Sequence, residues 1–345
     1  MLRIKDRQGR EMLYGPTNEE LITEIFRSSV KSYKLLPQML YHIQWKFRDE
    51  IRPRFGVMRC REFYMKDAYS FDVNDESAKK SYNKMFFSYL KTFERLGIKA
   101  IPMAADTGPI GGDLSHEFII IAETGESKIY TDKKIFEINL TKYNTDDESL
   151  SNLRKDFSSI YAATDDKFNK QEFEKKVDKN QQIITKGIEV GHIFYFGDKY
   201  SKALNCLIDD KDGKKTAVKM GSYGIGVSRL VGAIIEANYN KDIMKWPKSI
   251  SPFDVVIIVS INKNNNENIE KANKVYRELK NQNIDVLLDD VDENMSNKFK
   301  KHDLIGIPYQ IIVGSKSTNN NFEFKEVNTE SQAMSLSDIV SKLKN

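Results

Sequence analysis

The chain of 345 residues contains only two cysteines, Cys60 and Cys206. Two cysteines cannot build a disulfide framework, and their spacing is not that of a metal site, so we expect a reducing cytoplasm and no metal held by Cys or His. No apolar run approaches the roughly 20 residues that span a membrane, so we expect no membrane partner. The charged N-terminal residues 1–7 lack the apolar stretch of a signal peptide.

An excess of charge of one sign is also missing. The 54 Lys and Arg residues nearly balance 50 Asp and Glu residues, which leaves a net charge of +4. This balance is too even to indicate nucleic-acid binding by itself, so any such surface must come from local clusters. The length is sufficient for two or three domains with buried cores.

The most informative segment is 47–67, which reads FRDEIRPRFGVMRCREFYMKD. Two short runs flank a basic loop, a pattern that predicts an antiparallel hairpin. Alternate residues on a strand share a face, and one face of this hairpin is predicted to carry Arg48, Glu50, Arg59, Arg61 and Phe63. Such a face suits a nucleoside triphosphate, because arginines pair with phosphates and an aromatic ring stacks on a base. The alternative is a solvated ladder of charges on an edge strand.

A second pattern lies at 221–229, where GSYGIGVSR separates an expected strand at 215–220 from an expected helix at 227–237. A glycine-rich strand-to-helix turn lets the backbone approach a ligand. A dinucleotide-binding turn would carry a third glycine where this chain has Arg229. Together, the segments 47–67 and 221–229 resemble motifs 2 and 3 of the class II aminoacyl-tRNA synthetases, in the order found in that class.

A finer resemblance, to the bacterial-type prolyl-tRNA synthetases, covers nearly the whole chain. Its motifs are GPTNEE at 15–20, KFRDEIRPRFG at 46–56, MKDAYSF at 65–71, Gly111-Gly112 before SHEF at 115–118, GHIF at 191–194 and KYS at 199–201. The resemblance implies a proline–tRNA ligase, which uses ATP with Mg²⁺ to form prolyl-adenylate and then charges tRNA(Pro).

The resemblance also implies roles for the residues of the two motifs. Arg48 would bridge the α-phosphate and the proline carboxylate, and Arg48 and Arg229 would be the catalytic pair. Arg59 and Arg229 would hold the outer phosphates, Phe63 would stack on adenine, and Glu50 would contact the adenine side or a Mg²⁺-linked group. The full ATP-binding set is Arg48, Glu50, Arg59, Phe63, Gly224, Gly226 and Arg229.

The proline-binding set implied by the resemblance is Thr17, Glu19, Arg48, Asp67, Tyr69, His116 and Ser222. A secondary ammonium group suits a carboxylate and a hydroxyl acceptor, as Thr17 and Glu19 offer. The residues alone leave another interpretation open, in which Thr17 is a helix N-cap and Glu19 an acid favoured by the helix dipole. His116 beside apolar residues has the alternative of a packed histidine, and His192 is predicted to be structural.

The fold class that we expect is α/β in the broad sense. It is an α+β catalytic domain, with a mostly antiparallel sheet flanked by helices, followed by a small α/β domain. The catalytic domain is expected at 1–132 and 187–247, and the anticodon-binding domain at 252–345. A flavodoxin-like module remains the alternative for the latter. The polar span 133–186 is expected to be a surface insertion, too short for the editing domain of many bacterial members, so we expect no editing activity.

Helical periodicity predicts a helix that opens with a Thr17–Glu20 capping box and another from Asp75 to Gly97. Strands are expected near 99–103, 117–122, 128–130, 192–196 and 217–220, and a short helix near 169–177. The C-terminal region alternates between strands at 255–260, 285–288 and 309–313 and helices at 268–279, 296–302 and 335–343, which predicts a partly parallel sheet.

For tRNA, the resemblance implies that Arg52 and Arg54 contact the acceptor end and that the C-terminal domain binds the anticodon. The family commonly reads Asp-Asp-Arg where this chain has Asp-Asp-Val at 289–291. The family dimerises through motif 1, upstream of Gly-Pro-Thr, and no segment here corresponds to it. The sequence therefore leaves open the homodimer and the chain's own activity. The alternative function is a synthetase-derived tRNA-binding or regulatory protein without aminoacylation activity.

Overall fold

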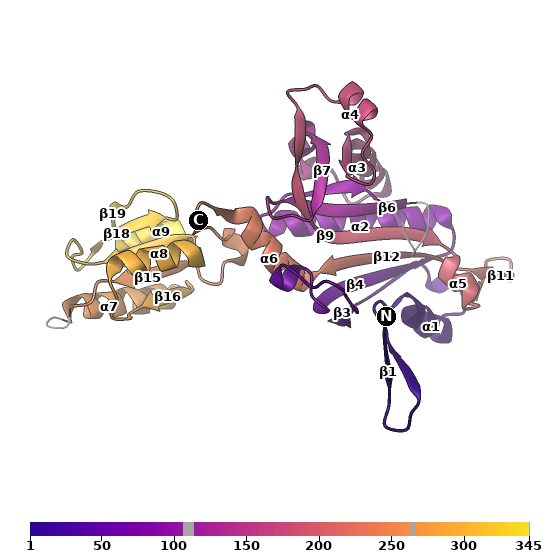
Figure 1. Cartoon of the computed structure of the whole chain (residues 1–345), viewed down its shortest axis with the longest axis horizontal. Helices are drawn as coiled ribbons and strands as arrows, with labels where there is room; N and C mark the ends of the chain where they lie inside the picture. The colour runs from indigo at the N-terminus through magenta and orange to yellow at the C-terminus, as the bar shows by residue number, and fades with distance from the viewer. Residues whose placement is uncertain (106–113, 263–265, 345) are drawn as a thin grey trace. The chain divides into compact units, whose positions relative to one another are not determined.

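The computed structural model describes residues 1–105, 114–262 and 266–344, so the predicted Gly111-Gly112 pair lies outside the described residues. The chain divides into two units, Met1–Ala237 and Asn238–Asn345 (Figure 1). Within the described ranges, no helix combines the length and apolar character needed to cross a membrane.

The first unit is built on an eight-stranded antiparallel sheet, as the sequence predicted. Its main path runs in the order β3 (Gln38–Phe47), β4 (Glu62–Asp72), β12 (Lys219–Gly226), β9 (Gln182–Gly197), β6 (Leu114–Ile121) and β5 (Ala100–Ala104). Two further strands, β7 (Ser127–Asp132) and β8 (Ala162–Thr164), extend the sheet from β9. The smaller elements of this unit are β1 (Leu2–Lys5), β2 (Glu11–Tyr14), α5 (Lys199–Ala203), β10 (Leu207–Asp209), β11 (Lys215–Ala217) and α6 (Val227–Asn238).

Two helices cover opposite faces of the sheet (Figure 1). On one face, α2 (Asp75–Arg95) buries a row of aromatic side chains, and its Phe86 lies 5.6 Å from Phe118 of β6, measured between ring centroids. On the other face, Phe26 of α1 (Glu19–Ser29) stacks on Phe71 of β4 at 4.0 Å. Because side chains alternate along a strand, the odd-numbered residues of β4 face α1 and the even-numbered residues face α2.

The start of α1 differs from the prediction. The helix begins at Glu19 with Asn18 at the N-cap position, and no side-chain hydrogen bond caps it. The Thr17 hydroxyl instead donates to the Glu19 carboxylate. The predicted Thr17–Glu20 capping box is therefore wrong, because the threonine hydroxyl is engaged by an acid of the first helical turn.

The hairpin of β3 and β4 is confirmed, but its strands end earlier than predicted. β3 ends at Phe47 and β4 begins at Glu62, so four residues predicted on strands lie in the connecting loop: Arg48, Glu50, Arg59 and Arg61. The backbone amide of Arg54 donates to the carbonyl of Arg59 at 2.9 Å and closes the loop tip. At that tip Gly56 has φ of 56°, a left-handed conformation that glycine adopts without steric cost.

The span 133–186 is more closely joined to the sheet than predicted. α4 (Lys170–Lys176) matches the expected short helix, but α3 (Asp147–Ser159) and β8 were not predicted. β8 pairs with β7, and β9 begins at Gln182 inside the span. Tyr130 and Phe173 are buried together, so apolar contacts hold this segment on the end of the sheet.

The glycine-rich segment 221–226 also differs from the prediction of a turn. These residues belong to β12, which pairs with β4 on one side and β9 on the other. A side chain at Gly224 would place its Cβ 2.4 Å from Met65 Cε, so the glycine allows the two strands' side chains to pack closely at this point.

The second unit has a five-stranded sheet in the order β16 (Val286–Asp289), β15 (Val255–Val259), β17 (Tyr309–Val313), β18 (Asn321–Glu326) and β19 (Gln332–Ser335). The first three strands are parallel, as predicted, whereas the antiparallel β18 and β19 were not predicted. The remaining elements are β13 (Tyr239–Asn240), β14 (Ile243–Met244), α7 (Glu267–Asn281), α8 (Met295–Ile305) and α9 (Leu336–Lys344).

A fully buried lysine joins the ends of two parallel strands in this unit. Lys298 Nζ donates to the carbonyl oxygens of Val259 at 2.9 Å and Asp289 at 3.0 Å. The Asp289 carboxylate also accepts from His302 Nε2 at 2.7 Å. Although burial opposes it, hydrogen bonds from Lys301 and His302 hold the pKa of Asp289 well below its usual value. The network therefore stabilises the charged form of this buried carboxylate.

We expect Lys298→Ala to lower the free energy of unfolding of the second unit by about 3 kcal/mol, because removing one partner leaves a buried charge and two carbonyls unsatisfied. Lys300→Ala in the same helix, α8, is the control and should lower it by less than about 1 kcal/mol, because Lys300 is exposed. Trp246 Nε1 donates to the Ile305 carbonyl of α8, so Trp246 fluorescence in a Trp45→Phe background reports this unit during urea unfolding. Equal effects of the two substitutions would contradict the prediction.

Candidate functional site

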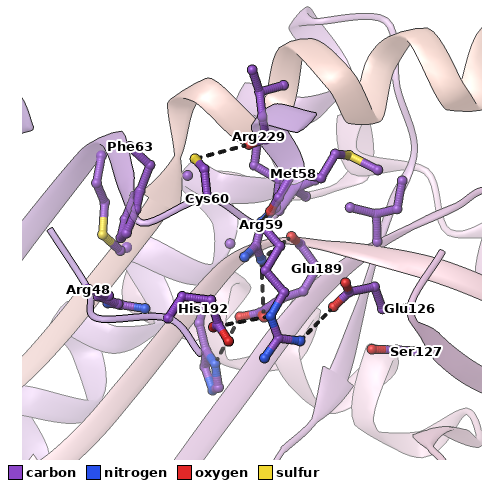
Figure 2. Close-up of a pocket in the computed structure, with 18 of the residues that line it drawn as sticks. Arg48, Met58, Arg59, Cys60, Phe63, Glu126, Ser127, Glu189, His192 and Arg229 are labelled. Atoms are coloured by element: carbon purple, nitrogen blue, oxygen red, sulfur yellow. Dashed lines mark hydrogen bonds and ion pairs between the residues drawn. The ribbon is translucent and has the colours of Figure 1, made fainter. Parts of the chain in front are cut away.

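One face of the first unit's sheet carries a cavity of about 330 Å³. It is lined by residues of β4, β12 and β9 and of the loop 48–61 that joins β3 to β4, several of which Figure 2 labels. All seven residues predicted to bind ATP line this cavity: Arg48, Glu50, Arg59, Phe63, Gly224, Gly226 and Arg229. The fold thus brings together residues that are up to about 180 positions apart in the sequence.

The loop residues of the cavity are held by ion pairs. Arg59 Nε lies 3.1 Å from Glu50 Oε2, and Arg59 Nη1 donates to Glu126 Oε2 at 3.0 Å. Arg48 lies over the Phe63 ring, 5.1 Å from its centroid. The cavity wall therefore presents two guanidinium groups beside one aromatic ring, a combination that can bind phosphates and a planar base.

Arg229, in the first turn of α6, is positioned by backbone carbonyls of two other segments. Its Nε donates to the Met58 carbonyl at 2.9 Å and its Nη1 to the Glu189 carbonyl at 3.0 Å. These two bonds direct the guanidinium to the cavity and connect α6 with the loop 48–61 and with β9 (Figure 2). Arg229 Nη1 also lies 3.5 Å from Glu189 Oε2, and as a lining residue of the cavity Arg229 contributes positive charge to it.

A second group of predicted residues adjoins the cavity. Glu19 is 2% exposed, and its two carboxylate oxygens accept from Thr17 and from Ser222, the latter at 3.1 Å. Arg48 Nε donates to the Pro16 carbonyl at 3.3 Å, which places this segment beside the cavity. A buried carboxylate with two hydroxyl partners is well suited to hold a cationic amine.

Asp67 and Tyr69 of β4 lie directly opposite Gly224 and Ser222 of β12 in the ladder. Asp67 is buried, and one of its oxygens accepts from the Tyr69 hydroxyl at 2.5 Å and from Lys46 Nζ at 2.9 Å. Its other oxygen, Oδ1, has no hydrogen-bond partner among the described residues. Burial raises the pKa of Tyr69 far above its usual value, so the phenol stays a hydrogen-bond donor to Asp67.

His116 is the exception among the predicted proline-binding residues. Its Nδ1 lies 2.6 Å from the Tyr82 hydroxyl, and its ring contacts Phe86 edge-on at 5.1 Å, so it faces α2. The neighbouring residues Ser115 and Glu117 contact His192 on the cavity side instead. The alternation of side chains along β6 therefore places His116 on the opposite face from the cavity, as a packed histidine, which corrects its assignment to the proline pocket.

The buried position of His116 predicts a pH-dependent stability. Burial lowers its pKa from 6.5 to about 3, so the folded chain keeps the ring neutral while the unfolded chain protonates near pH 6.5. A depressed pKa gives stability that is lost as the pH falls below about 6.5, and at pH 5 the loss is about 2 kcal/mol. His116→Gln should show a smaller fall in unfolding free energy between pH 7 and pH 5, measured by urea titration; an equal fall in both proteins would contradict this.

Three cavity-side residues could hold a divalent cation. Glu117, Glu189 and His192 each offer a ligand atom, and these atoms lie within 4.8 Å of one another. Burial and the nearby Glu189 raise the pKa of Glu117 to about 7. Partial burial opposes it, but His192 and Arg229 lower the pKa of Glu189, which therefore stays charged. The pair combines a charged carboxylate with one that a cation would readily deprotonate.

Several cavity residues were not predicted from the sequence, among them Glu126, Ser127, Gly187, Glu189 and His192. Glu189 lies two residues before the quoted GHIF segment, and His192 belongs to that segment but was predicted to be structural. Its Nε2 lies 2.7 Å from the Ser115 hydroxyl, and its Nδ1 lies 3.3 Å from Glu189. The sequence offered one signal for Glu189, which is an acidic residue close to the family motif at 191–194 and on the same strand.

Comparison with known proteins agrees with this geometry. Residues 2–238 match the family model of the tRNA synthetase class II core domain (G, H, P, S and T), and residues 255–345 match that of an anticodon binding domain. Among solved structures, the prolyl-tRNA synthetase of Cryptosporidium parvum complexed with L-proline and AMP superimposes with a TM-score of 0.73 at 15% identity. The match covers 99% of this chain and 60% of that one, and it confirms the predicted class II fold.

The similarity to sequences of known proteins is much higher. The chain is 65% identical to the proline–tRNA ligase of Pelagibacter ubique (strain HTCC1062), over all of this chain and 79% of that protein. It is 56% identical to the proline–tRNA ligase of Bartonella quintana (strain Toulouse), over 95% of this chain and 75% of that protein. The chain therefore belongs to the proline–tRNA ligase family of the class II aminoacyl-tRNA synthetases.

Proposed function

We propose that this chain activates proline with ATP and transfers the prolyl group to the 3′ end of tRNA(Pro). The observation that carries the proposal is that the seven candidate ATP ligands line one cavity, which adjoins the Thr17–Glu19–Ser222 group through Arg48. An intact cavity of this kind favours catalysis over the alternative of a binding protein without aminoacylation activity.

In the proposed activation step, an oxygen of the proline carboxylate attacks the α-phosphorus of ATP and pyrophosphate leaves. The carboxylate is already ionised, so the step needs no general base, and positioning and charge neutralisation supply most of the catalysis. Arg48 lies between the cavity and the Pro16–Thr17 segment, where its guanidinium is able to contact both anions. Arg59 and Arg229 would bind the outer phosphates, and Phe63 would stack on the base.

The proposed proline pocket holds the ring nitrogen with carboxylates. Glu19 would accept one N–H of the secondary ammonium, and Asp67 has a free acceptor in Oδ1. Tyr69 and Ser222 would fix these two acids in place. We leave His116 out of this pocket, because it faces α2.

Mg²⁺ is the cofactor that the family uses, and the residues present fit it. Hard carboxylate oxygens are the ligands that Mg²⁺ prefers, and Glu117 and Glu189 offer two such groups close together beside the cavity. We propose that these acids hold the ion, with His192 orienting Glu189. When bound, Mg²⁺ would neutralise charge on the phosphates of ATP.

The tRNA would contact both parts of the chain. We propose an acceptor-end contact for Arg52 and Arg54, and anticodon binding by the C-terminal domain at 252–345. The catalytic domain would comprise 1–132 and 187–247, with 133–186 as the short insertion between them. We further propose a cytoplasmic location, where the tRNA substrate is present.

Proline-dependent ATP–pyrophosphate exchange by the chain tests the proposed activation. We expect exchange with proline to exceed exchange with alanine by about tenfold or more, because alanine lacks the ring and its apolar contacts. Transfer to tRNA(Pro) is measured separately as formation of acid-precipitable prolyl-tRNA. Binding of a prolyl-adenylate analogue no tighter than that of proline, together with absent exchange, would reject catalysis in favour of a binding protein.

A further inference from the structure

Glu126 holds the loop 48–61 through two arginines. Its Oε1 accepts from Arg54 Nε at 3.0 Å. Its Oε2 accepts from Arg59 Nη1 at 3.0 Å, a contact that Figure 2 shows. Each carboxylate oxygen therefore binds a different guanidinium. Arg54 lies at the tip of the loop, and Arg59 lies at its return to β4. One acid on a distant turn therefore holds both of the residues that close the tip of the loop.

The turn that carries Glu126 is closely packed against the sheet. A Cβ on Gly125 would lie 2.4 Å from the Gly187 carbonyl oxygen, and one on Gly187 would lie 2.3 Å from an Ile119 methyl group, so these backbones are in close contact. The turn is also closed by a bond from the Gly125 amide to the Ala122 carbonyl at 3.0 Å. Thr124 Oγ1 donates to Glu236 at 2.7 Å. Glu126 is thus presented from a fixed position on the sheet.

The contacts made by Glu126 are of a kind that a substrate can break. The side chains of Arg54 and Arg59 are 51% and 39% exposed, and that of Glu126 is 29% exposed, so solvent weakens both ion pairs. A triphosphate carries more charge than a carboxylate and can accept two N–H groups of one guanidinium, whereas Glu126 accepts a single N–H from Arg59. Nucleotide phosphate and Glu126 would therefore compete for Arg59.

We propose that Glu126 is a latch, which holds the loop 48–61 through Arg54 and Arg59 until ATP phosphate takes Arg59. This inference rests on the proposed function, because it assigns the competing anion as ATP. Loss of Arg59 leaves Arg54 as the single remaining contact of Glu126 with the loop among the described residues. Arg54 is then more easily released, so nucleotide binding prepares the loop for the acceptor end of tRNA.

Glu126→Gln tests the latch, with Glu123→Gln as the matched control. Both residues lie in the 122–126 turn and both substitutions remove one negative charge, but only Glu126 contacts the two arginines. In ATP–pyrophosphate exchange at saturating proline, Glu126→Gln should lower the KM for ATP by about three- to tenfold, with kcat little changed. Glu123→Gln should leave the KM unchanged. An unchanged or raised KM in Glu126→Gln would overturn the proposal.

Trypsin cleavage after Arg54 gives a readout that does not need catalysis. In the absence of nucleotide, this bond should be cut faster in Glu126→Gln than in the unaltered chain. A non-hydrolysable ATP analogue should speed cleavage of the unaltered chain and have little effect on Glu126→Gln. Equal cleavage of both proteins without nucleotide would reject the latch. If the unaltered chain shows no exchange, the proposed activity is wrong. The trypsin rates of the two proteins would still test whether Glu126 holds the loop 48–61.

Discussion

Replacement of Arg48 by alanine is expected to lower proline-dependent ATP–pyrophosphate exchange by about 100- to 1000-fold. Its guanidinium lies between the cavity and the Pro16 carbonyl, where both anionic reactants must meet. Without it, the negative charge that develops at the α-phosphate loses its positioned donors, so kcat should fall more than the affinity for either substrate. The measurement is kcat and KM for ATP and for proline in the exchange assay.

Arg52→Ala is the matched control for Arg48→Ala. Arg52 lies in the same loop and is exposed, and it is not among the residues that line the cavity. We expect this substitution to leave exchange within about twofold of the unaltered chain, because activation does not use tRNA. Prolyl-tRNA formation should fall if Arg52 contacts the acceptor end. A comparable loss of exchange in both variants would indicate that the loop, rather than Arg48 itself, is what activation requires.

Glu19→Gln is expected to raise the KM for proline by about 100-fold while leaving ATP binding nearly unchanged. The amide keeps the size of the carboxylate, and its NH2 group can donate to a hydroxyl that turns to accept, but it removes the charge that a buried secondary ammonium requires. Glu19 is 2% exposed and is bonded to Thr17 and Ser222, so solvent is a poor substitute for the lost charge. Exchange kinetics with varied proline measure the effect.

The control for Glu19→Gln is Glu20→Gln on the next residue of α1, which is exposed. It removes the same charge from the same helical turn and should leave the KM for proline unchanged. Thermal unfolding of both variants checks that the helix is intact. A KM that rises equally in both variants would show that the effect comes from helix electrostatics and not from a contact with proline.

The fold was predictable where the sequence pattern was local and regular. The aromatic stripe of α2 and the alternation of β15, α7 and β16 were identified within a few residues, because burial on one face imposes a fixed period. β18 and β19 were missed, although Phe322 and Phe324 alternate with polar residues in β18. Their pairing is antiparallel at the edge of a parallel sheet, and such pairing is decided by neighbouring strands rather than by local pattern.

The candidate site was predictable only where it falls within motifs. The seven cavity residues recognised from motifs 2 and 3 lie together in the structure. Glu126 belongs to an ordinary turn, and its place at the cavity depends on contacts distant in sequence, such as that of Gly125 with Gly187. His116 shows the converse error, because a motif gives the residue type but the strand's register decides which face it occupies.

The register of β4 against β12 constrains how the proposed proline-binding and ATP-binding residues can change in evolution. Asp67 faces Gly224 and Tyr69 faces Ser222, so proline and nucleotide residues are interleaved along one ladder. Inserting or deleting one residue within either strand would turn Asp67 or Ser222 toward α2. The same change would move residues of both proposed pockets to the wrong face of the sheet. Amino-acid selectivity can therefore drift by substitution at fixed positions, while changes of length are confined to loops such as 48–61.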